Sequence, residues 1–276
     1  MKKKLSLVLC ICMISILAIT GCSKSSREDI LADMITSTKE TKSADMNIKM
    51  VIDMDATTNG TTQNTKINCD LNAQATTDPS VCKIDGKFDM ALLGMNKSMG
   101  VKSYSIKEED GSYTTYTFVE GQDKWTKAKV NQDSDKMNEL ANFKSMEGMF
   151  DNFQLADGTT DVNNVKCYKL TGSFEGDNLE KMLGSVESLS GNMKDSLGGL
   201  KANVEVYVNA KDKMPVQIKI DFKDSDLASA MGATEGSTLK VNDFYITMTY
   251  NGMNTIDKLE VPEDVKKNAV EGITTQ

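Results

Sequence analysis

Residues 45–55 read DMNIKMVIDMD, and this stretch decides the class of fold. Its apolar side chains alternate with mostly polar ones, at Met46, Ile48, Met50, Ile52 and Met54. Successive side chains of a β-strand point to opposite faces, so the pattern predicts a strand with one buried and one solvated face. Antiparallel sheets commonly expose one face to water in this way, which makes an antiparallel sheet the expected framework.

The same alternation recurs through the first half of the chain. Asn59-Gly60 is a strong signal for a hairpin turn, and the Asp-Pro-Ser sequence at 78–80 predicts a second turn. Strands of a meander are therefore expected at residues 46–54, 67–75, 82–92, 99–106, 113–119 and 125–127. The third of these has Phe88, Met90 and Leu92 on its inner face and an interruption at Gly86.

The second half mixes helices with further strands. Helical spacing of apolar residues is expected at 133–153 and 178–189, followed by a glycine-punctuated connection at 188–200 and a short helical turn at 227–231. Strands are expected at residues 165–175, 202–208, 214–222 and 239–250. Their inner faces carry Val204, Val206, Ile218, Ile220, Ile246 and Met248.

A helix precedes the first strand. Ser25 and Glu28 have the spacing of a capping box, which predicts a helix that starts here and ends near Lys42. Ile30, Leu31, Met34 and Ile35 form its apolar face. Its polar face is acidic, so we expect the helix to pack on the domain and not to lie on a membrane surface.

The N-terminus resembles a bacterial lipoprotein signal peptide. Three lysines at residues 2–4 precede an apolar run at 5–19, which is shorter than the roughly 20 residues that span a bilayer, and small residues lead to Cys22. The resemblance implies that residues 1–21 are removed and that Cys22 carries a diacylglyceryl group on the extracytoplasmic face of the cell membrane. The alternative is an uncleaved membrane anchor.

The expected organisation follows from this signal. Cys22 and a short tether would occupy residues 22–26, a single domain 27–265 and a polar tail 266–276. Two acyl chains give stable anchoring, so the membrane is an expected partner through the lipid alone. No other cofactor is expected.

Charge and composition exclude several classes of function. The formal net charge of −8 becomes about −11 once the three lysines of the signal are removed, which disfavours binding to nucleic acid or to anionic membranes. The chain has no histidine, which excludes Ser-His-Asp and Cys-His catalysis and any histidine-ligated zinc site. No acidic cluster has the spacing of a calcium loop, so neither catalytic nor metal-binding residues are predicted.

Three cysteines follow Cys22 in the chain, at Cys69, Cys82 and Cys167. Cys69 and Cys82 flank one predicted turn, and an extracytoplasmic location permits a disulfide between them. Three buried free thiols fit the sequence equally well, because an odd cysteine weakens the case for a disulfide framework.

The order of elements resembles the lipoprotein-carrier fold of LolA, LolB, LppX and LprG, and similar features occur in lipoproteins of Gram-positive bacteria. The stretches that carry the resemblance are 44–48, 123–127, 207–215 and 259–264. It implies an α+β fold in which a strongly curved antiparallel sheet, a half-open barrel, wraps around the N-terminal helix and the inserted helices.

In that group the concave face can open into a cavity for acyl chains. The resemblance therefore implies a non-enzymatic binder or carrier of a lipid or other amphiphile. The residues expected to line such a cavity are Met46, Ile48, Met50, Ile52, Met54, Phe88, Met90, Leu92, Val204, Val206, Ile218, Ile220, Ile246 and Met248. The alternative is a lipoprotein with a solid core that meets another envelope protein. An envelope hydrolase is least consistent with the sequence.

Overall fold

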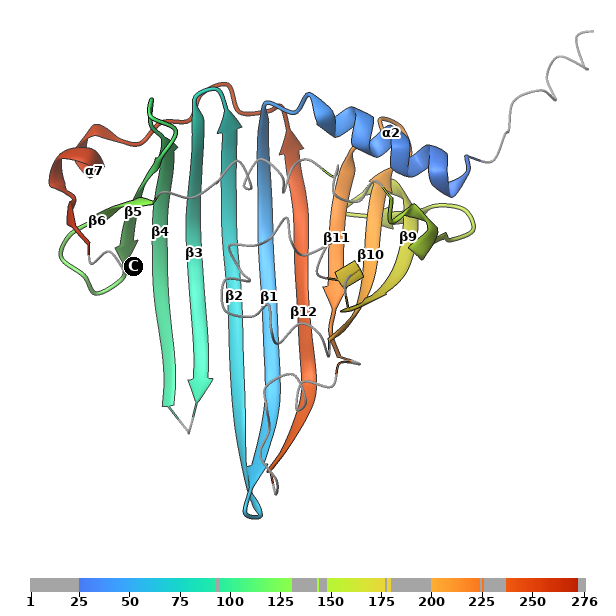
Figure 1. The fold of residues 1–276 in the computed structure, drawn as a ribbon, viewed down its shortest axis with the longest axis horizontal. Helices are drawn as coiled ribbons and strands as arrows, with labels where there is room; N and C mark the ends of the chain where they lie inside the picture. Colours follow the sequence, from blue (N-terminus) through green and yellow to red (C-terminus); the bar gives the residue numbers. More distant parts are fainter. Residues whose placement is uncertain are drawn as a thin grey trace, which may run out of the picture.

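The computed structural model describes residues 25–92, 95–130, 143, 148–176, 178–179, 200–223, 225 and 237–272. The strands in these ranges join in one sheet of thirteen strands (Figure 1). The predicted signal peptide and Cys22 lie outside the described residues. So do most of the predicted helices at 133–153 and 178–189, the connection at 188–200 and the turn at 227–231.

The first half of the chain is an antiparallel meander, as the alternation predicts. Its strands are β1 (Ser43–Thr58), β2 (Thr61–Thr77), β3 (Ser80–Leu92), β4 (Met95–Lys107), β5 (Tyr113–Val119) and β6 (Thr126–Val130). Asn59 and Gly60 connect β1 to β2 with φ of 52° and 76°, the positive values that the tightest hairpin turns require.

The second half forms the rest of the sheet. Its strands are β7 (Phe153–Leu155), β8 (Thr160–Val162), β9 (Val165–Glu175), β10 (Lys201–Asn209), β11 (Pro215–Asp221) and β12 (Ser237–Met253), and the short helix η2 (Phe150–Asn152) precedes β7. The spatial order is β6-β5-β4-β3-β2-β1-β12-β11-β10-β9-β7. β12 pairs along the whole of β1, from Ala44 with Met253 to Thr58 with Ser237, so the two halves meet at a seam between the first strand and the last long one.

Helix α2 (Arg27–Lys39) packs on the inner face of the sheet, where Ile30, Leu31 and Met34 are fully buried. Its capping box is formed by Ser26 and Asp29, one residue later than the predicted Ser25 and Glu28. Both pairs have the required spacing, and the sequence alone does not choose between them. The helix also ends at Lys39 and not near Lys42, because β1 already begins at Ser43.

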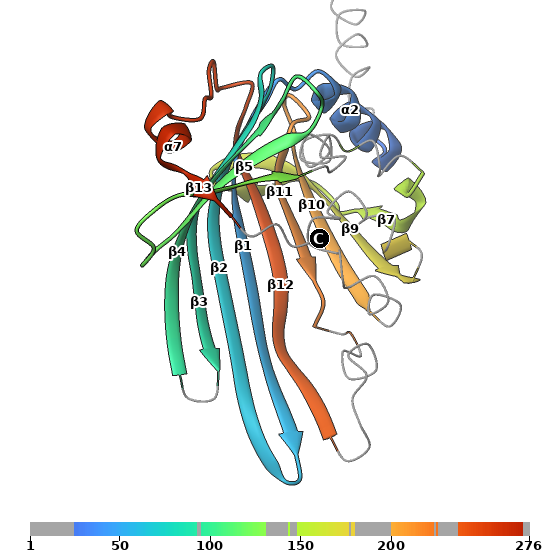
Figure 2. The same cartoon turned by 60° about the vertical axis from the view of Figure 1, so that its left-hand side comes forward.

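The C-terminal segment packs on the opposite, outer face of the sheet. Figure 2 shows α7 (Glu263–Asn268) and α2 on opposite sides of the bent strands. Beyond α7, β13 (Val270–Glu271) pairs in parallel with β6. The residues predicted as a polar tail, 266–276, therefore include the end of α7 and the whole of β13, while Val265, the last residue of the predicted domain, is buried against the outer face of the sheet.

The outer-face cluster under α7 is a second, smaller core. Its buried members are Val81, Tyr116, Leu259, Val261 and Val265. Trp125 packs beside them, with ring centroids 5.7 Å from Tyr104 and 5.6 Å from Phe118.

Two further expectations need correction. Cys69 and Cys82 are both buried and free, because the register places Cys69 opposite Phe88, six positions along β3 from Cys82 and roughly 20 Å away. Gly86 does not interrupt β3, which runs through it opposite Leu71. The predicted curved antiparallel sheet is confirmed, and it stays unclosed, with β13 and β7 at its ends.

Candidate functional site

The inner face of the sheet carries all the apolar residues that the sequence predicts for a cavity lining. Cross-strand partners lie on the same face of a sheet, so the register shows which side chains belong together. Three rows cross the seam between the two halves. The first contains Val206, Ile218, Met248, Ile48 and Leu71. The second contains Val204, Ile220, Ile246, Met50, Cys69, Phe88 and Met99. The third contains Phe244, Ile52, Ile67 and Met90.

The remaining predicted residues flank these rows on the same face. Met46 pairs with Tyr250 on one side and Ala73 on the other, while Met54 leads through Thr65 to Leu92. The structure thus brings the fourteen predicted residues onto one continuous apolar surface. A ligand can bind to this surface only where other elements of the protein leave it uncovered.

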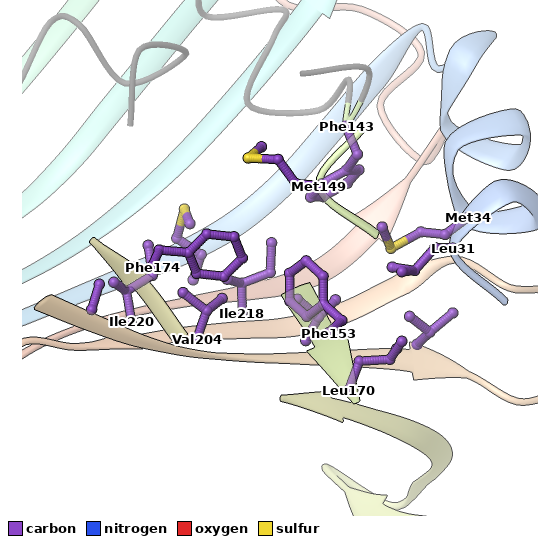
Figure 3. Close-up of a cluster of buried hydrophobic side chains, with 14 of the residues drawn as sticks. Leu31, Met34, Phe143, Met149, Phe153, Leu170, Phe174, Val204, Ile218 and Ile220 are labelled. Carbon is purple, nitrogen blue, oxygen red and sulfur yellow. The ribbon is translucent and has the colours of Figure 1, made fainter. Parts of the chain in front are cut away.

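One end of this surface is a packed core. Figure 3 shows Leu31 and Met34 of α2 beside Phe153, Phe174 and their neighbours on the sheet. The side chains of Leu31, Met34 and Phe153 are completely buried, and the rings of Phe153 and Phe174 lie 5.2 Å apart. Phe143 and Met149 are also buried here. This end has the solid interior of an ordinary globular domain.

The surface continues well beyond that core. The strands β1–β4 and β12 extend past the ends of β10 and β11 (Figure 1). Along them Met50, Ile52, Phe88 and Met90 are only half-buried, in contrast to Met46, which is 1% exposed. Exposure rises further at the hairpin between β3 and β4, to 38% at Leu92 and 66% at Met95.

Away from the apolar cluster under α7, the outer face carries polar side chains that hydrogen-bond to one another. Asn64 and Asn242 each donate to both Asp53 and Asp55, at 2.8 to 3.2 Å. These hydrogen bonds lower the pKa of both carboxyl groups. Asn242 is placed for this by a bulge in β12, which lies opposite the step from Asp53 to Met54.

A second polar group lies on the outer face of the other half. Lys169 Nζ is 2.7 Å from Glu205 Oε1, and the Tyr207 hydroxyl donates to Glu205 Oε2 at 2.7 Å. Burial acts to raise the pKa of Glu205, but the two hydrogen bonds outweigh it and hold that pKa below its usual value. The outer face therefore has its polar groups satisfied by one another.

The described residues offer little for proton or nucleophilic chemistry. Burial raises the pKa of Cys69 to about 11 and that of Cys82 to about 12, so neither thiol is a ready nucleophile. Within the described ranges, His, Cys, Asp and Glu side chains form no group of three that could hold a metal ion. What the inner face offers is apolar contact.

The predicted lining omitted residues that the register places in these rows, namely Ile67, Leu71, Met99 and Phe244, and it also omitted Met95 and Lys97 on β4. Lys97 lies opposite Met90 on the inner face of β4. Extending the alternation of Met99 and Val101 backwards by two and four residues would have placed both on the inner face.

A family model described as "Family of unknown function (DUF6612)" matches residues 26–270. A search of curated proteins returned no match. In the helices that the structure describes, no segment has the length and apolar content needed to cross a bilayer.

Solved structures of low sequence identity are also similar. The lipoprotein LppX of Mycobacterium tuberculosis is 12% identical, with 85% of this chain and 100% of that chain covered and a TM-score of 0.44. LprF of Mycobacterium bovis is 11% identical, with 86% and 96% covered and a TM-score of 0.47. A LolA superfamily protein of Nitrosomonas europaea is 10% identical, with 87% and 96% covered and a TM-score of 0.23.

Proposed function

The chain belongs to the DUF6612 family, and from the form of its sheet and its N-terminal sequence we propose that it is a membrane-anchored extracytoplasmic lipoprotein that binds or carries a lipid or other amphiphile without catalysis. The observation that carries the proposal is the extension of the apolar inner face beyond the packed core. Half-buried side chains such as Ile52 and Met90 leave apolar area in contact with water. Covering such area stabilises a complex by about 25 cal/mol per Å², and an acyl chain is a suitable cover.

The anchor supports the same proposal. Residues 22–26 link the predicted lipidated Cys22 to α2, and a fully extended chain spans at most about 3.5 Å per residue. The domain would therefore stay close to the bilayer that supplies its ligand. Mass spectrometry of the protein from membranes should find Cys22 as the N-terminal residue with a diacylglyceryl group attached; an unmodified Cys22 that still follows residues 1–21 would contradict lipid anchoring through this residue.

The test of binding uses the mature chain, residues 22–276, expressed without the signal peptide and with Cys22→Ser, then purified and extracted with organic solvent. Mass spectrometry should find a co-purified amphiphile, and the stripped protein should take up a fluorescent fatty acid. An Ile52→Trp substitution, which fills the inner face, should abolish uptake. Val51→Trp on the outer face of the same strand is the matched control and should leave uptake unchanged.

Circular dichroism and thermal unfolding distinguish blocked binding from misfolding in these variants. No extracted amphiphile and no uptake by the folded parent protein would overturn the proposal.

The packed end around Leu31, Met34 and Phe153 favours a second candidate, a lipoprotein with a solid core that meets another envelope protein. That candidate predicts specific cross-linking to an envelope protein by folded protein that takes up no amphiphile.

A further inference from the structure

Lys97 is a charged side chain on an otherwise apolar part of the inner face. It lies directly opposite Met90, at the end of the row formed by Phe244, Ile52, Ile67 and Met90. It is exposed to solvent, and the nearby hairpin residues Leu92 and Met95 are exposed as well. A cation therefore marks the point where the apolar row meets water.

The position is unusual within the sheet. In the described parts of β1–β4 and β12, the register places two charged side chains on the inner face, Lys97 and Lys107. Lys107 lies near the other end of β4, with its Nζ 5.9 Å from the centre of the Tyr113 ring. Lys97 forms no ion pair with any carboxylate that the structure describes.

An inward-pointing charge can also protect a sheet edge from pairing with another chain. Lys97 meets that description, because β5 begins to pair with β4 at Val101 and the strand segment at 95–99 has no described neighbour on that side. Edge protection alone predicts no preference among ligands. The two roles are therefore separable by experiment.

The row has dimensions that suit an acyl chain. From Lys97 on β4 it crosses β3, β2 and β1 to Phe244 on β12, which is four steps of about 4.8 Å, or about 19 Å in all. This is comparable with the length of an extended long acyl chain. A ligand lying along the row would place its head group at Lys97.

Resting on the proposed function, we propose that the inner face selects amphiphiles with an anionic head group, a carboxylate or a phosphate, which pairs with Lys97 while the acyl chain lies along Met90, Ile67 and Ile52. Opposite charges attract, whereas a neutral head group gains nothing from Lys97 and a cationic one is repelled. The pair is exposed, so its effect on affinity is moderate and sensitive to salt.

The test uses the same mature chain, residues 22–276 with Cys22→Ser, stripped of bound lipid, and four probes below their micelle concentrations. Calorimetry compares laurate and dodecyl phosphate with neutral monolaurin and cationic dodecyltrimethylammonium. We expect the anionic probes to bind about fivefold more tightly than monolaurin, and high salt to remove this difference. The ratio between laurate and dodecyl phosphate shows which head group the site prefers.

Substitutions assign the preference to the residue. Lys97→Glu should reduce the affinity for both anionic probes to that for monolaurin or below, and Lys97→Arg should retain it. Lys87→Glu makes the same charge change on the outer face of β3 and should have no effect. If Lys97→Glu does not fold, Lys97→Gln takes its place.

The outcomes separate this inference from the function on which it rests. Equal binding of laurate and monolaurin, or unchanged laurate binding after the Lys97 substitution, overturns anion selection and leaves amphiphile binding in place. Absence of binding by any probe overturns both.

Discussion

Gly86 shows how closely β2 and β3 approach each other. A Cβ atom placed on Gly86 would lie 2.2 Å from the backbone oxygen of Asp70 and 2.8 Å from the Cα of Leu71. Both are main-chain atoms of the neighbouring strand, which cannot move without disturbing the ladder. Glycine is therefore required here for space and not for an unusual backbone angle.

Replacing Gly86 with alanine should consequently destabilise the fold by about 1–3 kcal/mol, the usual cost of forcing extra volume into a packed site. Gly100→Ala is a matched control on β4, because its Cβ would meet the carboxylate end of Glu120, at 2.9 Å, and that flexible side chain can move away. Urea unfolding should show a clear decrease in the free energy of unfolding for Gly86→Ala and a small change for Gly100→Ala. Equal losses would refute the backbone argument.

Cys69 on β2 and Cys82 on β3 should be unreactive in the folded protein. With pKa values of about 11 for Cys69 and about 12 for Cys82, at most about one thiol in a thousand is ionised at pH 8. We expect Ellman's reagent to label neither residue until urea unfolds the chain. Rapid labelling at pH 8 without denaturant would contradict this burial.

Arg27, the first residue of α2, hydrogen-bonds to the far half of the sheet. Arg27, the single arginine of the sequence, donates from Nη1 to the backbone oxygen of Phe153 at 2.9 Å, and its Nη2 lies 3.1 Å from Asp151 Oδ1. The planar guanidinium reaches both acceptors at once, which an ammonium group cannot do.

Arg27→Ala should therefore lower the free energy of unfolding by about 1–2 kcal/mol, in line with a partly buried charged hydrogen bond. Lys39→Ala, at the exposed last turn of the same helix, is the control and should change it by less than about 0.5 kcal/mol. Hydrogen exchange of the α2 amides should accelerate in the first variant alone.

The C-terminal segment gives a second test at the level of an element. Val265 is 4% exposed under α7, whereas Val270 is 42% exposed on β13. Val265→Asp buries an unpaired carboxylate and should destabilise the fold by at least about 2 kcal/mol. Val270→Asp makes the same chemical change at an exposed position and should be nearly neutral by the same unfolding measurement.

Acid stability is a property of the whole sheet surface. Hydrogen bonds hold the pKa values of Asp53 and Asp55 below the ordinary value, and a contact with Lys129 does the same for the pKa of Asp110. A carboxyl group whose pKa is lowered on folding stabilises the fold fully above its unfolded pKa, near 4, and this stabilisation is lost as pH falls.

We therefore expect the urea midpoint to fall as pH decreases below about 4. Asp55→Asn removes one of these carboxyl groups and should make the dependence shallower, while Asp78→Asn, at the β2–β3 turn, serves as a control. A midpoint that is constant between pH 5 and pH 3 would falsify this account of the outer face.

The sequence predicts the strands well because each strand has one buried face. Apolar residues therefore recur at every second position of a strand, as they do around Met50 in β1 and around Ile220 in β11. It also identifies the inner-face residues, since a strand's faces follow from alternation alone. It does not predict register, which decides that Cys69 lies opposite Phe88 and that Lys97 ends an apolar row. Nor does it predict the outer cluster, because Val265 becomes buried and Trp125 partly buried only through contacts between distant segments.

The seam between β1 and β12 has a consequence for the order of folding. The meander β1–β6 can form from local hairpins as soon as residues 43–130 exist, but β1 keeps an open edge until Ser237–Met253 is available. Contacts of such long sequence separation slow folding, because a long loop must close before they form. We therefore expect a slow last step in which β1 of one preformed meander pairs with β12 of the other. Before that step the folding intermediate exposes the unpaired edge of β1, which is its most aggregation-prone strand.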